Sequence, residues 1–158
     1  MVFLDASALA KAYLDEEGST NVQGVLDRQD GSLFLSDFVA LEVLTSLRTA
    51  YRKAPRPVYQ RAVDRFRADY PSRFSIVDVS AVIRASAMDL TTWRRTARAR
   101  GMDVLHLATA LWLQSARRTG EVTMVTSDRD LEALSKECGL RTFDPSREPL
   151  AALPVRRR

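Results

Sequence analysis

Strand-sized runs of apolar residues recur along the chain, with segments of helical periodicity between them. The runs are too short for helices and lie at 2–4, 33–35, 74–77, 122–125 and 140–143. Apolar residues recur at three- and four-residue spacing, as on one face of a helix, at 9–14, 22–26, 38–51, 58–70, 82–99, 104–116 and 131–138. Strands that alternate with helices predict an α/β fold with a mostly parallel sheet, because each parallel connection needs a helical crossover.

The length of 158 residues suits one domain with a core of its own. The periodic pattern ends after Phe143, and the chain ends in three arginines. We therefore expect a single domain over residues 1–145 and a basic, flexible C-terminal tail over residues 146–158.

Several classes of protein are excluded by composition. No apolar run approaches the ~18 residues of a membrane span, and the first residues lack the pattern of a secretory signal, so we expect a cytoplasmic protein without membrane contact. The single cysteine, Cys138, excludes an internal disulfide and a cysteine-based zinc site, and the single histidine, His106, excludes a site with several histidines. A bound metal ion must therefore be held by carboxylates.

Charge is distributed unevenly along the chain. Residues 1–47 carry two basic and eight acidic side chains, whereas residues 48–118 carry fifteen basic and five acidic ones. This asymmetry predicts an acidic site and a surface that attracts a polyanion, although a solvated basic helix face would give the same count. The basic side chains expected to border the acidic site and hold phosphates are Arg48, Arg52, Arg94, Arg95 and Arg98.

Two acidic residues follow expected strands. Asp5 ends the first strand, and Asp128 comes shortly after the fourth. In a parallel sheet, ligands bind beyond the carboxyl ends of the strands, so both residues are candidates for a functional site. Each could instead be a helix N-cap, since aspartate is favoured at that position.

Two further acids occur in apolar helical surroundings. Glu42 interrupts an apolar stretch of the helix expected after the second strand, and Asp103 opens a helix that is apolar on nearly all sides. A buried carboxylate is costly unless it is paired or bound to a metal, although Glu42 could simply face solvent. The expected topology brings both helix starts to the edge where the first strand ends, so all four acids can converge.

Four converging carboxylates repel one another unless protons or cations offset their charge. Hard oxygen ligands without histidine or cysteine favour Mg²⁺ or Mn²⁺. Two such ions a few ångströms apart can promote the in-line hydrolysis of a phosphodiester bond. The acids therefore predict a metal-dependent hydrolase acting on phosphodiesters.

Taken in order, the four acids and their neighbours resemble the motifs of PIN-domain ribonucleases, specifically of the VapC toxin kind. The matching segments are 5–9, 40–44, 103–110 and 126–131. Each segment is short, but their order at the boundaries between expected strands and helices makes the combination specific. The resemblance covers the chain from Met1 to about Phe143.

The resemblance implies a single PIN-like domain whose five-stranded parallel sheet has the order 3-2-1-4-5, which places the first and fourth strands side by side. It implies that four acids are catalytic and bind Mg²⁺ or Mn²⁺, with two ions expected: Asp5, Glu42, Asp103 and Asp128. Ser7 and Thr126 match small hydroxyl residues that orient a carboxylate or a water on the metal.

The activity implied by the resemblance is metal-dependent endoribonuclease cleavage of RNA by the toxin component of a toxin–antitoxin pair. The implied partners are the RNA substrate, a small VapB-like antitoxin and a second copy of the chain in a homodimer. Two other functions fit the same residues: a catalytically inactive PIN-like module that binds RNA or a protein partner, and a housekeeping PIN-type nuclease. A haloacid-dehalogenase-like phosphatase needs a second aspartate where this chain has Ser7.

Three further polar residues near these motifs have structural interpretations. His106, three residues after Asp103, is expected to be a histidine that forms hydrogen bonds on a buried helix, and could act as a general base only if it faced the cleft. Asp37 and Asp130 could supplement the four acids, but we expect an N-cap at Asp37 and a solvated first-turn acid at Asp130.

Overall fold

The computed structural model describes residues 1–28, 32–116 and 121–153. Its strands are β1 (Val2–Leu4), β2 (Leu33–Ser36), β3 (Ser75–Val77), β4 (Thr123–Val125) and β5 (Arg141–Phe143). Its α-helices are α1 (Ala6–Leu9), α2 (Ser19–Arg28), α3 (Val39–Ala50), α4 (Arg56–Arg73), α5 (Ala81–Thr91), α6 (Gly101–Ala116) and α7 (Arg129–Glu137). Three short 3-10 helices complete the described elements: η1 (Ala10–Tyr13), η2 (Arg94–Thr96) and η3 (Leu150–Ala152).

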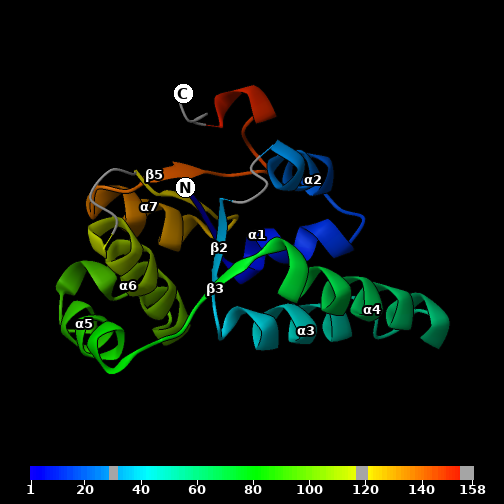
Figure 1. Cartoon of the computed structure of the whole chain (residues 1–158), viewed down its shortest axis with the longest axis horizontal. Helices are drawn as coiled ribbons and strands as arrows, with labels where there is room; N and C mark the ends of the chain where they lie inside the picture. The colour runs from blue at the N-terminus through cyan, green and yellow to red at the C-terminus, as the bar shows by residue number, and fades with distance from the viewer. Residues whose placement is uncertain (29–31, 117–120, 154–158) are drawn as a thin grey trace.

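The five strands form one parallel sheet in the order β3-β2-β1-β4-β5 (Figure 1). The central strand β1 pairs Val2 with Leu33 on one side and with Thr123 on the other. The predicted fold class and strand order are therefore confirmed. Because the sheet is parallel, all strands end at the same edge. The strand order reverses between β1 and β4, at the middle of this edge, which is where ligands bind in such sheets.

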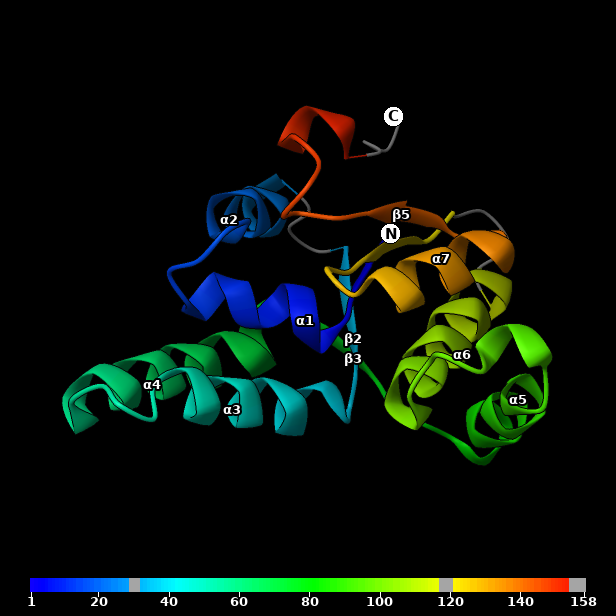
Figure 2. The ribbon, with the colours of Figure 1, turned by 180° about the vertical axis from the view of Figure 1, so that it is seen from behind.

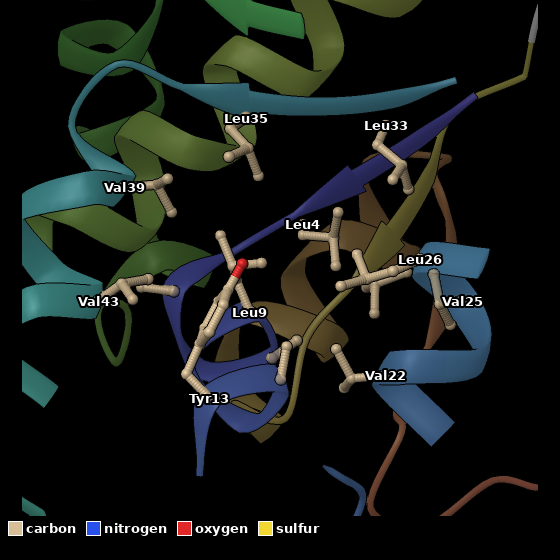
Figure 3. Packing of buried hydrophobic residues seen from close by; sticks show 14 of the residues in the cluster. Leu4, Leu9, Tyr13, Val22, Val25, Leu26, Leu33, Leu35, Val39 and Val43 are labelled. Atoms are coloured by element: carbon tan, nitrogen blue, oxygen red, sulfur yellow. The ribbon is translucent and has the colours of Figure 1, made fainter. Parts of the chain in front are cut away.

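Helices cover both faces of the sheet. Alternate strand residues point to opposite sides, so Val2 and Leu4 pack with α1, α2, α3 and α4, whereas Phe3 packs with α5, α6 and α7. Figures 1 and 2 show these two groups of helices on opposite sides of the sheet, and Figure 3 shows the core around Leu4 and Leu33. Burial on both faces explains why the strand runs are apolar at nearly every position.

The helix expected over residues 82–99 is shorter in the structure. α5 ends at Thr91, and the separate turn η2 follows. The buried hydroxyl of Thr96 donates to the carbonyls of Leu90 (3.1 Å) and Trp93 (2.7 Å), which satisfies groups that a helix end leaves unpaired. The arginines after Trp93 therefore lie in a connection that leads into α6, not along one basic helix face.

The packed part of the chain continues past the boundary expected at residue 145. Asn21 of α2 donates from Nδ2 to the carbonyls of Pro145 (2.8 Å) and Glu148 (3.0 Å), and Leu153 is buried in the core. We call residues 144–153 the C-terminal strap. Of the tail expected at 146–158, residues 146–153 belong to this strap, and residues 154–158 lie outside the described residues.

No helix within the described residues is both long enough and apolar enough to cross a membrane.

Asn21→Ala removes the two hydrogen bonds that the Asn21 side chain donates to the C-terminal strap. We expect this substitution to lower the free energy of unfolding by about 1–3 kcal/mol, because two carbonyls lose a donor. The measurement is chemical denaturation, with Thr20→Ala at an exposed position of the same helix as the control. Equal stability of the two variants would show that the strap does not depend on Asn21.

Candidate active site

Acidic residues follow the strands at the carboxyl edge of the sheet. Asp5, Asp37, Asp78 and Asp144 come directly after β1, β2, β3 and β5, and Asp128 comes three residues after β4. Figure 2 shows α1 and α7 leaving β1 and β4 beside each other at this edge. The sequence analysis did not single out Asp78 and Asp144, although both follow a strand in the same way as Asp5.

Asp5 is the most buried of the four predicted site acids, at 4% exposure. Its Oδ1 accepts hydrogen bonds from the backbone N–H of Ala8 (3.0 Å) and from the hydroxyl of Ser7 (2.9 Å). Burial raises the pKa of Asp5 to about 6, and these hydrogen bonds together with electrostatic attraction from His106 limit the rise. Asp5 is the N-cap of α1, as the alternative interpretation expected. Its hydrogen bonds do not fully offset the cost of burying the charged carboxylate.

Ser7 and Thr126 connect the ends of β1 and β4. Their hydroxyl oxygens lie 3.3 Å apart. Ser7 Oγ accepts from the backbone N–H of Ser127 (2.9 Å), and Thr126 Oγ1 accepts from the backbone N–H of Asp128 (3.0 Å). The two hydroxyls therefore fix the position of Asp128 relative to Asp5.

Asp128 and Asp103 each accept hydrogen bonds from nearby backbone groups. Asp128 is the N-cap of α7, and its Oδ1 accepts from the N–H groups of Asp130 (2.8 Å) and Leu131 (3.0 Å). Asp103 Oδ2 accepts from the N–H of Arg100 (2.7 Å) at the start of α6. Burial raises the pKa of Asp103, and the negative charge of Asp128 contributes to the rise, so the two carboxylates interact across the edge.

Glu42 pairs with a histidine. Its Oε2 lies 2.5 Å from Nε2 of His106, and its side chain is about one-third exposed. His106 itself is buried, as expected, and its Nδ1 lies 2.9 Å from the hydroxyl of Ser36 at the end of β2. This pairing was not predicted from the sequence, because His106 and Glu42 lie in separate motifs and Ser36 lies in neither.

The two supplementary acids differ in role. Asp130 is an exposed acid in the first turn of α7, as expected. Asp37 does not cap α3, so that expectation is wrong. Its Oδ2 instead accepts from the backbone N–H of Val79 (3.2 Å), in the turn after β3. A carboxylate at this position closes that turn because Asp37 and the end of β3 are neighbours across the sheet.

The basic candidates separate into two groups. Arg48 and Arg52 are exposed at and beyond the last turn of α3, and Arg48 lies about 9 Å along the helix axis from Glu42. Arg94 and Arg98 are exposed in the connection that leads to α6. The side chain of Arg95 lies outside the described residues. Arg94 and Arg98 therefore lie just before the helix that carries Asp103, whereas Arg48 and Arg52 lie at the end of α3 opposite to Glu42.

The donor chemistry of the four predicted site acids fits a hard divalent cation, because all of their donors are carboxylate oxygens. The uncompensated burial of Asp5 and the repulsion between Asp103 and Asp128 are also what a cation would relieve. In the part of the chain that the structure describes, no three acidic, histidine or cysteine side chains lie close enough to hold one ion. The structure thus brings the four acids to one edge, with each carboxylate bonded to a donor from the protein.

Comparisons with known proteins agree with this geometry. The sequence model of the PIN domain family matches residues 2–137. No curated protein matches the chain in sequence.

Solved structures of similar fold include three from bacteria. FitAcB from Neisseria gonorrhoeae has a TM-score of 0.69 at 15% identity, covering 94% of this chain and 100% of that one. VapC20 from Mycobacterium tuberculosis, described as a sarcin–ricin loop cleaving toxin, has a TM-score of 0.63 at 14% identity, covering 85% and 95%. VapBC2 from Rickettsia felis, bound to a DNA fragment from its promoter, has a TM-score of 0.59 at 17% identity, covering 91% and 98%. These similarities establish the fold.

The family match extends from β1 to the end of α7 and includes all four predicted site acids. The resemblance inferred from the order of the acidic motifs is therefore confirmed, and the chain belongs to the PIN domain family.

Proposed function

We propose that the chain is a cytoplasmic, divalent-metal-dependent endoribonuclease and the toxin component of a toxin–antitoxin pair. The observation that carries the proposal is the buried carboxylate of Asp5, whose pKa is raised to about 6 at the end of the central strand. A chain that keeps such a group at the edge where three other acids gather has a use for positive charge at that point. Membership of the PIN domain family makes nucleic acid the expected substrate class.

The residues that would hold the ion or ions are Asp5, Glu42, Asp103 and Asp128. A divalent cation bound there supplies the positive charge that phosphodiester hydrolysis needs at the phosphate and at the attacking water. Ser7 holds one oxygen of Asp5 through its hydroxyl, and Thr126 holds the backbone of Asp128. These two residues orient Asp5 and Asp128 relative to each other at the ends of β1 and β4.

Substrate contact is proposed for the exposed arginines. Arg94 and Arg98 precede the helix that carries Asp103, which suits contacts with phosphates on either side of a scissile bond. Arg48 and Arg52 lie along α3, away from its start, and would reach more distant phosphates. Similarity to VapC20, a sarcin–ricin loop cleaving toxin, supports RNA as the substrate.

The proposed protein partner is a small VapB-like antitoxin. Similarity to VapBC2, which is bound to promoter DNA, supports a partner of this kind. A basic side chain from such a partner could pair with the site acids and compete with the metal, since a guanidinium binds a carboxylate in two-pronged geometry. A homodimer is part of the same proposal.

Asp103→Asn and Asp128→Asn should each lower RNA cleavage by about two orders of magnitude or more, because each removes a charged metal ligand. The measurement is the rate of cleavage of RNA in Mg²⁺ or Mn²⁺, with loss of cleavage in EDTA. Asp89→Asn, at an exposed position on α5, is the control and should cleave like the wild type.

Near wild-type cleavage by Asp103→Asn at saturating Mg²⁺ would contradict the assignment. RNA binding without cleavage in either metal would favour the inactive binding module. Growth arrest on expression of the wild type, but not of Asp103→Asn, distinguishes a toxin from a housekeeping nuclease.

The raised pKa of Asp5 predicts how stability depends on pH. Between 3.8 and about 6, the folded protein binds more protons at Asp5 than the unfolded chain does, so the free energy of unfolding falls as pH rises. In metal-free buffer, the wild type should lose about 2–3 kcal/mol relative to Asp5→Asn between about pH 4 and about pH 7. Denaturation at each pH measures this difference.

The control for this experiment is Asp64→Asn, which changes an exposed aspartate on α4. Its stability relative to the wild type should vary little over the same range. A difference between wild type and Asp5→Asn that stays constant with pH would show that the folded protein does not raise the pKa of Asp5.

A further inference from the structure

Three elements meet at a short chain of hydrogen-bonding groups behind Glu42. Ser36 ends β2, His106 lies on α6, and Glu42 lies on α3. The Ser36 hydroxyl is 2.9 Å from Nδ1 of His106, and Nε2 of the same ring is 2.5 Å from Oε2 of Glu42. Ser36 is fully buried and His106 is 1% exposed, whereas the side chain of Glu42 is 31% exposed. These three hydrogen-bonded side chains therefore extend from the core to the edge of the sheet that carries the site acids.

We propose that Ser36 and His106 are positioning residues that hold the Glu42 carboxylate in place for the metal. This inference rests on the metal site of the proposed function and assigns two residues that the four acidic motifs do not include. Both residues act through Glu42 and are not assigned a contact with a reacting group.

The ionised carboxylate of Glu42 decides which groups donate and which accept in these two hydrogen bonds. An ionised carboxylate only accepts, so Nε2 of His106 carries the hydrogen and donates it to Glu42. When the ring is neutral, Nδ1 is then an acceptor, and the Ser36 hydroxyl is its donor. Ser36 thereby selects the tautomer that serves Glu42, as the outer partner of a metal-binding histidine does in other sites.

The bond to His106 restricts a side chain that would otherwise be mobile. Fixing a glutamate side chain costs rotamer entropy. Without a hydrogen-bond partner, a carboxylate on the surface of a helix populates several rotamers. A bond at Oε2 fixes that direction and leaves Oε1 able to accept a cation. His106 is also close enough to Asp5 and Asp103 to interact with both electrostatically, so the ring lies beside the acids that would share the ion.

A purely structural role would also explain a buried histidine, so the test must separate the two. His106 is the only histidine in the sequence, so protein labelled with ¹⁵N in histidine gives a single set of ring signals from the full chain. In metal-free wild type we expect hydrogen on Nε2 and none on Nδ1. Titration with Mg²⁺ should shift the Nε2 signal, because Glu42 joins the ion.

Ser36→Ala should allow the other tautomer and weaken Mg²⁺ affinity by about 10-fold, the lower end of the range for partners of metal ligands. The matched control is Ser135→Ala, since Ser135 is fully buried and its hydroxyl has no hydrogen-bond partner within the described part of the chain. This variant should keep the wild-type tautomer and the wild-type Mg²⁺ affinity.

Two further comparisons address fold and coupling. His106→Gln keeps an N–H donor near the position of Nε2 and should retain more of the Mg²⁺ affinity than His106→Leu. In a Glu42→Gln background, Ser36→Ala should cause no further loss of affinity, because the residue through which it acts has been changed. Additive losses would mean that Ser36 supports the fold alone and would overturn the inference.

The outcomes separate the inference from the proposed function. Wild type that binds Mg²⁺ while Ser36→Ala binds it equally well overturns the positioning role and leaves the metal site intact. Hydrogen on Nδ1 with none on Nε2 in the wild type also overturns it. Wild type that shows no response to Mg²⁺ contradicts the metal site itself, and the inference falls with it.

Discussion

The burial of the Asp5 carboxylate at the end of the central strand is the constraint on which the rest of the site depends. β1 lies between β2 and β4, so the residue that follows it is surrounded by the ends of both neighbours and by the helices that start there. Ala8 and Ser7 hydrogen-bond to the carboxylate, yet burial still raises its pKa to about 6. These hydrogen bonds therefore do not fully stabilise the negative charge of Asp5, which lies where the strand order reverses.

Acids farther from β1 have protein partners that serve structure. Asp144, after the edge strand β5, is buried and bonds to Arg147, Ser127 and the backbone of Ser146. Asp37, after β2, closes the turn that follows β3. The same sequence pattern, an aspartate after a strand, thus gives structural residues after β2 and β5 and candidate ligands after β1 and β4.

The sequence predicted the sheet and the four acids because both depend on local patterns and on order along the chain. Short apolar runs predicted the strands, and the resemblance to PIN domains implied their order. The acids at strand and helix boundaries led to the proposed metal site. The end of α5 at Thr91 was missed because it depends on the hydroxyl of Thr96 reaching back to the helix. The bond between Glu42 and His106 was missed because it joins residues 64 positions apart, and no local pattern encodes such a contact. The C-terminal strap was expected to be a flexible tail because its contacts with α2 join residues even farther apart, 124 positions in the case of Asn21 and Pro145.

The central claim is that the acids at this edge bind a divalent cation in the folded state, and thermal unfolding in the presence of Mn²⁺ tests it most directly. A cation that binds only the folded protein stabilises it by about 3 kcal/mol at a concentration 100 times its dissociation constant. For a domain of this size the melting temperature should then rise by about 5–10 °C in the wild type, and by much less in Asp5→Asn. An equal response in both proteins, or no response of the wild type to millimolar Mn²⁺, would contradict the account.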